Sequence, residues 1–356
     1  MTPCVSVVMP VRDGERWISE AIASLAAQSF ADFELLIVDD GSTDKTGEIV
    51  AGAAQRDQRV RLIRLPPSGI VAALNCGLDQ ARGHYIARLD ADDRAHPTRL
   101  DRQVAFLNTQ VGVGIVGSWA EVIDGDDRTI GRLRPETAPA VLADILPKRN
   151  PLLHSSVMWR AELCAKVGRY RAAFEAAEDY DLWLRMAEHC LLANIPDYLV
   201  QYRRHDNSIS RHRQLRQMFS TRLARRSAHG RRMHGADPAG GLIAPPDWST
   251  TGANDEFYAA DAMLYRFLEL SAADAAYSPS ARNFDLPAAQ VGEFPMTHDE
   301  RRLAQLALLN IVAANACLSS RHRMRLLAHF ISLHPARAMR LLGRRLRRKL
   351  LGKSRT

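Results

Sequence analysis

The chain has 356 residues, which at roughly 150 residues per domain predicts about two domains. Hydrophobic residues make up 46% and charged residues 25% of it, values of ordinary globular proteins that exclude a wholly disordered, collagenous or multi-span membrane chain. The charge is unevenly divided, because residues 1–210 hold 24 Lys and Arg against 29 Asp and Glu, whereas residues 211–356 hold 24 against 11. An acidic N-terminal part is thus followed by a strongly basic C-terminal part.

The cysteines and the N-terminal residues lead us to expect a cytoplasmic protein. No Cys-x-x-Cys pair is present, which argues against a disulfide framework and a zinc ribbon; the five cysteines are Cys4, Cys76, Cys164, Cys190 and Cys317. No basic segment and no hydrophobic segment of a signal peptide precedes the first apolar run. The longest uncharged stretch, residues 303–320, is interrupted by polar side chains, so it predicts a buried helix rather than a membrane span.

The first hundred residues alternate the patterns of strands and helices. Short runs rich in β-branched and apolar residues predict strands at residues 5–9, 33–38, 60–65 and 85–89. Apolar residues at helical spacing predict helices between them, at residues 15–28, 43–55 and 69–81. This alternation predicts an α/β fold with a mostly parallel sheet, flanked by helices and joined by right-handed crossovers, as in mononucleotide-binding proteins.

Beyond Pro97 the pattern is less regular. It predicts a helix to Leu107, a Gly-rich strand at residues 112–118 and a polar, turn-rich segment at residues 124–139, for which no topology follows. After residue 210 the sequence becomes rich in Arg and His, with apolar residues at helical spacing. We therefore expect an α/β domain in residues 1–210 and a mainly helical, basic C-terminal extension in residues 211–356.

Acidic loops follow two of the predicted strands. The second strand ends in the sequence DDGSTD, residues 39–44, and the fourth in DADD, residues 90–93. Either loop alone is nearly as well explained by helix capping, with Ser42 or Thr43 as the cap of the second helix. Two such loops at neighbouring strand ends, however, repel each other unless a cation or a nucleotide lies between them. Because the loops offer oxygen ligands and no thiolates, we expect Mg²⁺ or Mn²⁺ rather than zinc.

A third acidic pair, Glu178-Asp179, opens a helix whose buried side is predicted to include Leu182, Trp183 and Met186. The helix dipole stabilises a carboxylate in the first turn in its ionised form, which suits a general base. A purely structural role, in which the acids complement the dipole, is equally compatible with the sequence at this point.

Five segments, in order, carry a resemblance to a known family. They are VSVVMPVRDGERWISEAIASLAAQSF, ELLIVDDGSTDKT, GHYIARLDADD, EDYDLWLRM and YRRHDNSIS. Over about residues 3–210 the chain resembles family 2 glycosyltransferases of the GT-A fold. The resemblance implies inverting transfer of a sugar from a nucleotide-diphosphate sugar, usually a UDP-sugar, to a hydroxyl of a carbohydrate or lipid-linked acceptor such as a surface-polysaccharide or glycolipid precursor.

The resemblance also implies roles for single residues. Asp179 matches the catalytic base. Asp92 matches the carboxylate that holds Mn²⁺ or Mg²⁺, and His205 matches a histidine that reaches the metal, a surface histidine being the alternative. The positions that match the nucleotide-sugar site, with Asp39 at the nucleobase, are Pro10, Val11, Glu15, Asp39, Asn75, Asp90, Ala91 and Glu178.

Two departures from the family pattern limit these implications. The Q-x-x-R-W signature of processive members is absent, and residues 201–205 (QYRRH) are its nearest approach, so one sugar per encounter is expected. Many relatives carry an Arg just before the Asn of the helix at residues 69–81, where this chain has Ala73-Leu74-Asn75. Any nucleotide contact of that Arg is therefore missing here.

The C-terminal residues predict a basic amphipathic helix. In residues 339–351 (MRLLGRRLRRKLL), Leu and Met form one stripe and Arg and Lys crowd the remainder. Such a helix in residues 338–356 would bind an anionic membrane at about 1 kcal/mol per basic residue, placing the protein peripherally on the inner face of the cytoplasmic membrane. Packing of the stripe on the protein body is the alternative. Nucleic acid is not favoured, because no aromatic interleaving or recognised motif is present.

The sequence thus favours a metal-dependent, non-processive glycosyltransferase. A sugar nucleotidyltransferase is an alternative, although residues 10–14 (PVRDG) are a poor version of the Gly-rich phosphate loop that such enzymes carry after the first strand. A non-catalytic scaffold that binds membrane or nucleic acid through residues 301–356 is the alternative from another class.

Overall fold

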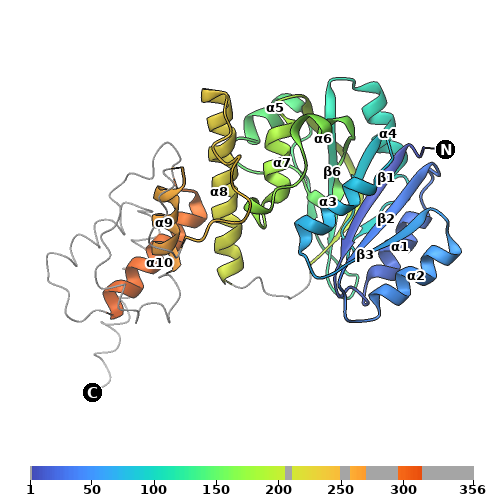
Figure 1. Cartoon of the computed structure of the whole chain (residues 1–356), viewed down its shortest axis with the longest axis horizontal. Coiled ribbons are helices and arrows are strands. Elements are labelled where there is room, and N and C mark those ends of the chain that lie inside the picture. The colour runs from blue at the N-terminus through green and yellow to red at the C-terminus, as the bar shows by residue number, and fades with distance from the viewer. Residues whose placement is uncertain (1, 205–210, 249–256, 270–295, 315–356) are drawn as a thin grey trace, which may run out of the picture. The chain divides into compact units, whose positions relative to one another are not determined.

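The structure is a computed structural model that describes residues 2–204, 211–248, 257–269 and 296–314 (Figure 1). The chain divides into two compact units, which are described separately below. The first consists of Met1–Ser208 with Ser227–Pro245, and the second of Ile209–Arg226 with Pro246–Thr356.

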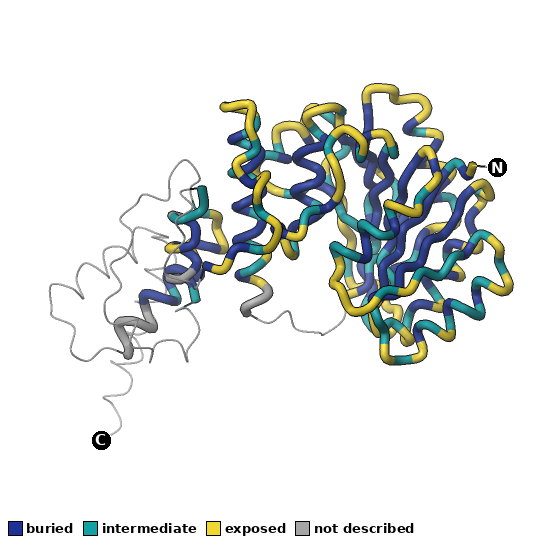
Figure 2. Tube along the Cα trace, viewed as in Figure 1, coloured by how far each residue is buried: buried dark blue, intermediate teal, exposed yellow. Residues whose placement is uncertain are grey.

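One half of the sheet in the first unit is parallel. Its strands, in spatial order, are β3 (Val60–Leu65), β2 (Phe33–Asp40), β1 (Val5–Val11) and β4 (Tyr85–Arg88). The helices that connect them are α1 (Ile18–Ala26), α2 (Thr46–Arg56) and α3 (Ile70–Gln80). Nearly every residue of β1 and β2 is buried, because helices cover both faces of these strands, and this explains their continuous apolar sequence (Figure 2). The predicted α/β fold is confirmed.

The other half of the sheet is mixed, which corrects the expectation of a mostly parallel sheet. Beyond β4 the order continues with β8 (Met158–Arg160), β6 (Val113–Ile123), β9 (Leu191–Arg203) and β5 (Arg94–Ala95), and β7 (Thr129–Leu133) pairs with β6. β8 is antiparallel to β4 and to β6, whereas β6 and β9 are parallel. β6, β9 and β4 therefore run in the same direction. The loose pattern after Pro97 reflects this half, where strand length varies from 2 residues in β5 to 13 in β9 and where β6 and β7 form a hairpin.

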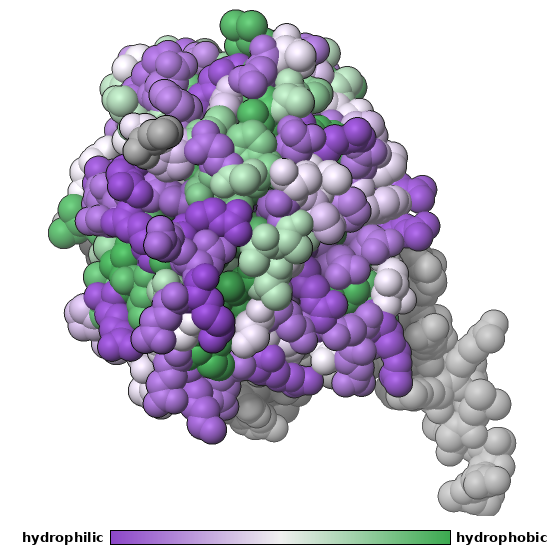
Figure 3. Space-filling model, turned by 90° about the vertical axis from the view of Figure 1, so that its right-hand side faces the viewer, coloured by the Kyte–Doolittle hydropathy of each residue, from purple (hydrophilic) through white to green (hydrophobic). Residues whose placement is uncertain are grey.

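Two helical layers enclose the sheet. The main hydrophobic core joins one face of the strands to α1, α2 and α4 (Arg99–Thr109). On the opposite face α3 lies so close to the sheet that a Cβ on Gly77 would come within 2.5 Å of Val8. This unit also contains α5 (Pro139–Ile145), α6 (Glu162–Val167), α7 (Glu178–Met186) and the last turns of α8 (Arg211–His234), with 3₁₀ turns at His154–Ser156 and Ala172–Phe174. Figure 3 shows a face of the protein on which hydrophilic side chains surround small hydrophobic patches.

The described part of the second unit is helical. It contains the part of α8 (Arg211–His234) up to Arg226, together with α9 (Ala259–Glu269) and α10 (His298–Ala314). A buried ionic cluster joins these helices, because Arg222 pairs with Asp261 at 2.5 Å and with Glu300 at 3.4 Å. α10 covers the N-terminal part of the predicted buried helix at residues 303–320, and its Leu303 and Leu308 are buried.

No helix in the described ranges is long and apolar enough to span a membrane. The predicted amphipathic helix at residues 339–351 lies outside the described residues, as does the rest of the segment after Ala314.

Candidate active site

The predicted site residues follow the carboxyl ends of neighbouring parallel strands. Asp39, near the end of β2, is in register with Val11 of β1. On the other side of β1, Asp90 lies two residues beyond Arg88, the last residue of β4. Adjacent strands lie about 4.8 Å apart, so the two acidic loops are about 10 Å apart on either side of β1. Pro10 and Val11 are buried between them.

Hydrogen bonds tie the loop after β1 to the loop after β2. The amide of Asp13 donates to Oγ of Ser42 at 2.9 Å, and the amide of Gly14 donates to Oγ1 of Thr46 at 2.8 Å. In return, the Asp13 carboxylate accepts the amide of Thr43 at 2.8 Å. The two loops therefore form one hydrogen-bonded rim beside Val11.

Glu15 belongs to the same rim. Its carboxylate accepts the amide of Lys45 at 3.0 Å, directly before Thr46, the first residue of α2. A carboxylate at this point satisfies an otherwise unpaired amide of the helix start. The interpretation of Ser42 or Thr43 as the cap of this helix is wrong, because both lie in the loop before Lys45 and α2 has no side-chain cap from its own N-cap residue.

Asp39 and Asp40 are adjacent in sequence and differ in their surroundings. Asp39 is only 5% exposed, and its carboxylate accepts the amide of Ser42 at 2.9 Å. Asp40 instead caps α3, because its carboxylate accepts the amides of Ser68 at 2.7 Å and Gly69 at 2.9 Å. Asp40 is therefore structural, whereas Asp39 lies at the rim formed by the first two loops.

A buried arginine pairs with Asp90. Arg88 is 1% exposed, and its Nη2 lies 2.5 Å from Oδ1 of Asp90. Burial favours the protonated acid, but the charges of Arg88 and His154 hold the pKa of Asp90 below its ordinary value. Among the described residues, Nε and Nη1 of Arg88 have no hydrogen-bond partner. Two buried nitrogens of this guanidinium therefore lack an acceptor within the described ranges, beside an ionised carboxylate.

Arg203, at the end of β9, holds the acidic loop after β4 in place. Its backbone amide donates to Oδ1 of Asp93 at 2.7 Å, and its Nε donates to the carbonyl oxygen of Asp92 at 2.8 Å. The same buried guanidinium pairs with Glu20 of α1 at 2.9 Å and with Asp127 of the turn between β6 and β7. One side chain therefore connects four separate segments around this loop.

The acids of the loop after β4 influence one another electrostatically. Burial raises the pKa of Asp93 well above its ordinary value, and the charges of Asp90 and Asp92 raise it further. Ala91 lies between these acids and is partly buried. No group of three or more His, Cys, Asp or Glu side chains in the described ranges is arranged to hold a metal ion, and His205 lies outside those ranges. The carboxylates of Asp90 and Asp92 are oxygen ligands of the kind that Mn²⁺ or Mg²⁺ binds, whereas Asp93 is buried and accepts the backbone amide of Arg203.

Glu178 and Asp179 open α7 after a sharp turn. Ala176 adopts φ 64°, a left-handed conformation that costs a non-glycine residue about 1 kcal/mol and that places the two acids in the first turn of α7. The Asp179 carboxylate accepts the Nδ2 amide of Asn150 at 2.9 Å and the amide of Tyr180 at 2.6 Å. Asp179 is partly buried, whereas Glu178 is 8% exposed and its Oε2 has no hydrogen-bond partner within the described part of the chain.

The carboxyl groups of Glu178 and Asp179 both have pKa values above their ordinary range. Burial raises the pKa of Asp179 to about 6, the hydrogen bonds from Tyr180 and Asn150 oppose this, and the charge of Asp90 adds to it. Burial, followed by the charge of Asp179, raises the pKa of Glu178 to about 7, and Arg88 lowers it. Asp90, Glu178 and Asp179 therefore interact electrostatically, although they are about 90 residues apart in sequence. A carboxylate with a pKa of about 6 is ionised at neutral pH and still basic enough to accept a proton.

His154 and Tyr170 complete the buried surroundings of Arg88. His154 Nε2 lies 2.9 Å from the Tyr170 hydroxyl, and burial together with the Arg88 charge lowers the pKa of His154 to about 3. The amide of Asn75 binds the backbone of Tyr170, donating to its oxygen at 2.9 Å and accepting its amide at 3.1 Å. Asn75, matched to the nucleotide site by sequence, here holds the segment before α7 against α3.

An ionic cluster fixes α7 itself. Asp181 is fully buried and pairs with Arg185 at 2.9 Å and with Arg171. The other nitrogens of Arg185 donate to the backbone oxygens of Val167 at 2.5 Å and Arg169 at 2.7 Å. The orientation of Asp179 is therefore set by the same cluster that anchors its helix.

Four residues of the site carry no predicted role in the sequence: Arg88, His154, Asn150 and Arg203. Arg88 and Arg203 lie in two of the quoted segments, and an unpaired charge inside a predicted buried strand is a signal that could have identified Arg88. His154 and Asn150 follow no periodic pattern, and only the fold brings them to Arg88 and Asp179.

The fold defines the class of protein. TarS of S. aureus, residues 1–349 in complex with UDP-GlcNAc, matches with a TM-score of 0.53 over 94% of this chain and 87% of that chain, at 17% identity. The likeness shows the fold, which is the GT-A fold of glycosyltransferases.

Sequence comparison then gives the family. The chain is 35% identical over 215 residues to EpsE of Bacillus subtilis (strain 168), covering 59% of this chain and 76% of EpsE. It is 29% identical over 208 residues to the O-antigen biosynthesis glycosyltransferase WbnJ of Escherichia coli, covering 57% of this chain and 81% of WbnJ. The profile described as glycosyl transferase family 2 matches residues 6–161. The chain belongs to this family and is a glycosyltransferase, which rules against the nucleotidyltransferase and the non-catalytic scaffold as its main function.

Proposed function

We propose that the protein transfers one sugar per encounter, with inversion, from a nucleotide-diphosphate sugar to an acceptor hydroxyl. Asp179 is the base: the hydroxyl oxygen attacks the anomeric carbon, its proton passes to the Asp179 carboxylate, and the bond from that carbon to the diphosphate oxygen breaks. The observation that carries the proposal is the position of Asp179 in the first turn of α7, electrostatically coupled to Asp90 at the carboxyl end of β4. Its pKa of about 6 suits this role.

The donor is expected to lie along the edge of the sheet between the two acidic loops. Asp39 and the rim that contains Glu15 lie at one end, and the loop from Asp90 to Asp93 lies about 10 Å away. This spacing supports a nucleobase near Asp39 and a diphosphate near Asp90. UDP-GlcNAc, with which TarS forms a complex, is the first donor to test.

A divalent cation is part of the proposal. Asp92, with Asp90 nearby, is expected to hold Mn²⁺ or Mg²⁺, and the ion would neutralise charge on the departing diphosphate. The close succession of Asp90 and Asp92 after β4 supports a cation here, because carboxylate oxygens are the ligands that these ions prefer. His205, which matches a metal-reaching histidine of the family, is proposed as a further ligand of the ion.

The acceptor is proposed to be a carbohydrate or a lipid-linked sugar of a surface polysaccharide or glycolipid. The similarity to WbnJ, named for O-antigen biosynthesis, supports this class. A cytoplasmic location, with residues 338–356 binding the inner face of the membrane, belongs to the same proposal and rests on the composition of that segment.

The deciding experiment measures donor binding and transfer separately. Thermal shifts of the full chain with UDP, GDP, CMP and dTDP sugars, each with and without Mn²⁺, are expected to identify one stabilising donor. Asp92→Ala should lose the Mn²⁺-dependent part of that shift, and an unchanged Mn²⁺ titration would refute the metal role. Asp179→Asn should keep the shift and lose transfer, whereas Asp144→Asn on the exposed face of α5 should keep both. Normal turnover by Asp179→Asn would exclude it as the base.

A further inference from the structure

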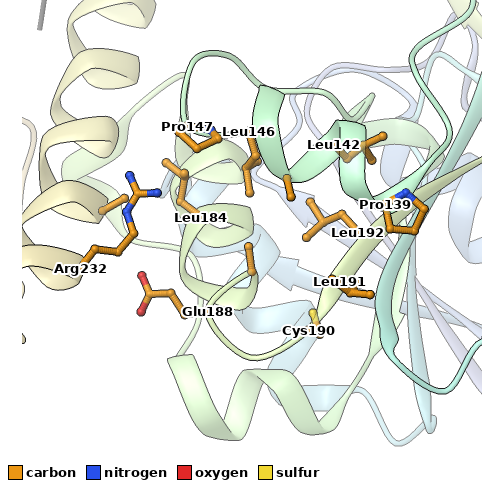
Figure 4. Close-up of a pocket in the computed structure, with 13 residues that line it drawn as sticks. Pro139, Leu142, Leu146, Pro147, Leu184, Glu188, Cys190, Leu191, Leu192 and Arg232 are labelled. Atoms are coloured by element: carbon orange, nitrogen blue, oxygen red, sulfur yellow. The ribbon is translucent and has the colours of Figure 1, made fainter.

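A cavity of the first unit lies away from the acidic loops. It has a volume of about 390 Å³ and is enclosed by α5, the last turn of α7, the start of β9 and the part of α8 that belongs to this unit (Figure 4). Its walls are almost entirely leucine, alanine and proline, with Leu142 and Leu146 on one side, Leu184 on another, and Leu191 and Leu192 across from them. Pockets of this size and lining ordinarily bind small apolar molecules or chains.

Part of this apolar surface remains open to solvent. Leu191 is 49% exposed although it begins a strand whose next residues are buried. Full burial of a leucine side chain is worth about 1.5–3 kcal/mol relative to exposure. A ligand that covers Leu191 would therefore gain binding free energy from the burial of this side chain.

The charged residues of the cavity gather at one end. Figure 4 shows Glu188 and Arg232 on the side opposite Leu142 and Pro139. The Glu188 carboxylate is already neutralised, because Nε of Arg231 lies 2.7 Å from its Oε1. Arg232 has neither an ion pair nor a hydrogen bond to any residue that the structure describes. The cavity therefore combines an apolar interior with one available positive charge.

We propose that this cavity binds the hydrocarbon chain of a lipid-phosphate acceptor, with the phosphate at Arg232. The ligand has to be apolar over most of its volume and anionic at one end, and an alkyl or isoprenyl phosphate meets both conditions. The proposal rests on the proposed transfer at Asp179. α7 connects the two places, since Asp179 and Ala187 are eight residues apart, or about 12 Å along a helix axis. A short saccharide on the lipid phosphate spans that distance.

Farnesyl phosphate is the probe, measured by calorimetric titration of the full chain below the concentration at which the lipid aggregates. Farnesol, which lacks the charge, and inorganic phosphate, which lacks the chain, are the comparison ligands. Saturable binding of farnesyl phosphate is expected, with weaker binding of farnesol and none of inorganic phosphate at equal concentration.

Two variants separate the two halves of the site. Arg232→Gln should weaken farnesyl phosphate about tenfold and leave farnesol unchanged, because only the charged contact is lost. Ala187→Leu, which fills the cavity, should weaken both ligands. The matched controls are Arg128→Gln, at a side chain 77% exposed in the turn after β6, and Ala26→Leu on the exposed side of α1; neither should alter binding.

Equal affinity of the wild type and both cavity variants for farnesyl phosphate would overturn the proposal. Binding only to anionic phospholipid vesicles, unaffected by Ala187→Leu, would also overturn it, because it would indicate a membrane contact elsewhere on the chain. The titration requires no sugar donor. Its failure is therefore distinct from failure of the transferase proposal, which is judged by donor turnover on a water-soluble acceptor.

Discussion

Replacing Asp179 by Asn should stabilise the α/β unit while it abolishes transfer. The pKa of Asp179 is about 6 in the folded protein against an ordinary value of 3.8, and this difference corresponds to about 3 kcal/mol. Since the folded-state pKa is raised, the ionised carboxylate opposes folding: the penalty is absent below pH 3.8, grows as the pH rises, and is complete above about pH 6. Asn carries no such penalty, but it retains one oxygen for the two donors of Tyr180 and Asn150, which costs about 1 kcal/mol. The net gain at pH 8 is about 2 kcal/mol.

Urea denaturation of the wild type and Asp179→Asn at pH 8 and pH 4.5 tests this reasoning. The gain should nearly vanish at pH 4.5, where much of the wild-type carboxyl group is protonated in the folded state. The exposed Asp144→Asn should show no comparable dependence on pH. The reasoning would be refuted if the Asp179→Asn protein were less stable than the wild type at pH 8, or equally stabilised at both pH values. Either result would show that burial does not raise the pKa of Asp179 to about 6.

Three further outcomes are expected. The transfer rate should be about tenfold lower at pH 5 than at pH 7, because Asp179 must be ionised to accept a proton; a rate independent of pH between these values would exclude it as the base. Arg203→Met should lower the free energy of unfolding by about 2 kcal/mol, a modest loss because its partners Glu20 and Asp127 are 42% and 46% exposed and regain water. The same substitution should weaken donor binding, and unchanged donor affinity would show that Arg203 does not position the loop. Deleting residues 338–356 should move the protein from anionic liposomes to the supernatant in sedimentation, and equal sedimentation of both forms would end the membrane proposal.

The parallel half of the sheet could be predicted from sequence because its signals are local. The continuous apolar runs of β1 and β2, and the helical spacing between them, are set by burial within each element. The acidic loops were found for the same reason, since a loop that directly follows a predicted strand has a predicted place. α2 starts at Thr46 rather than at residue 43, because the amide of Thr46 is accepted by Asp44 and that of Lys45 by Glu15, from a loop 30 residues earlier.

The other half depends on contacts that no local pattern encodes. β8 is only three residues long, and its place between β4 and β6 follows from pairing alone. Asn75 forms hydrogen bonds with the backbone of Tyr170, which lies 95 residues later in the sequence. The roles of Asp39, Asp92 and Asp179 stay predictions, although the fold puts Asp39 and Asp90 on loops at either side of β1 and the charge of Asp90 acts on Asp179.

The contact between Arg203 and the loop after β4 has a consequence for synthesis of the chain. Residue 203 is made 110 residues after Asp93, so a ribosome-bound chain that already contains every strand of the parallel half still lacks the clamp on its acidic loop. Long-range closures of this kind are formed late, because the intervening chain has to be ordered first. The chain should therefore acquire transferase activity only after β9 has been made. Fragments that end before β9 should have no transferase activity, even where they fold.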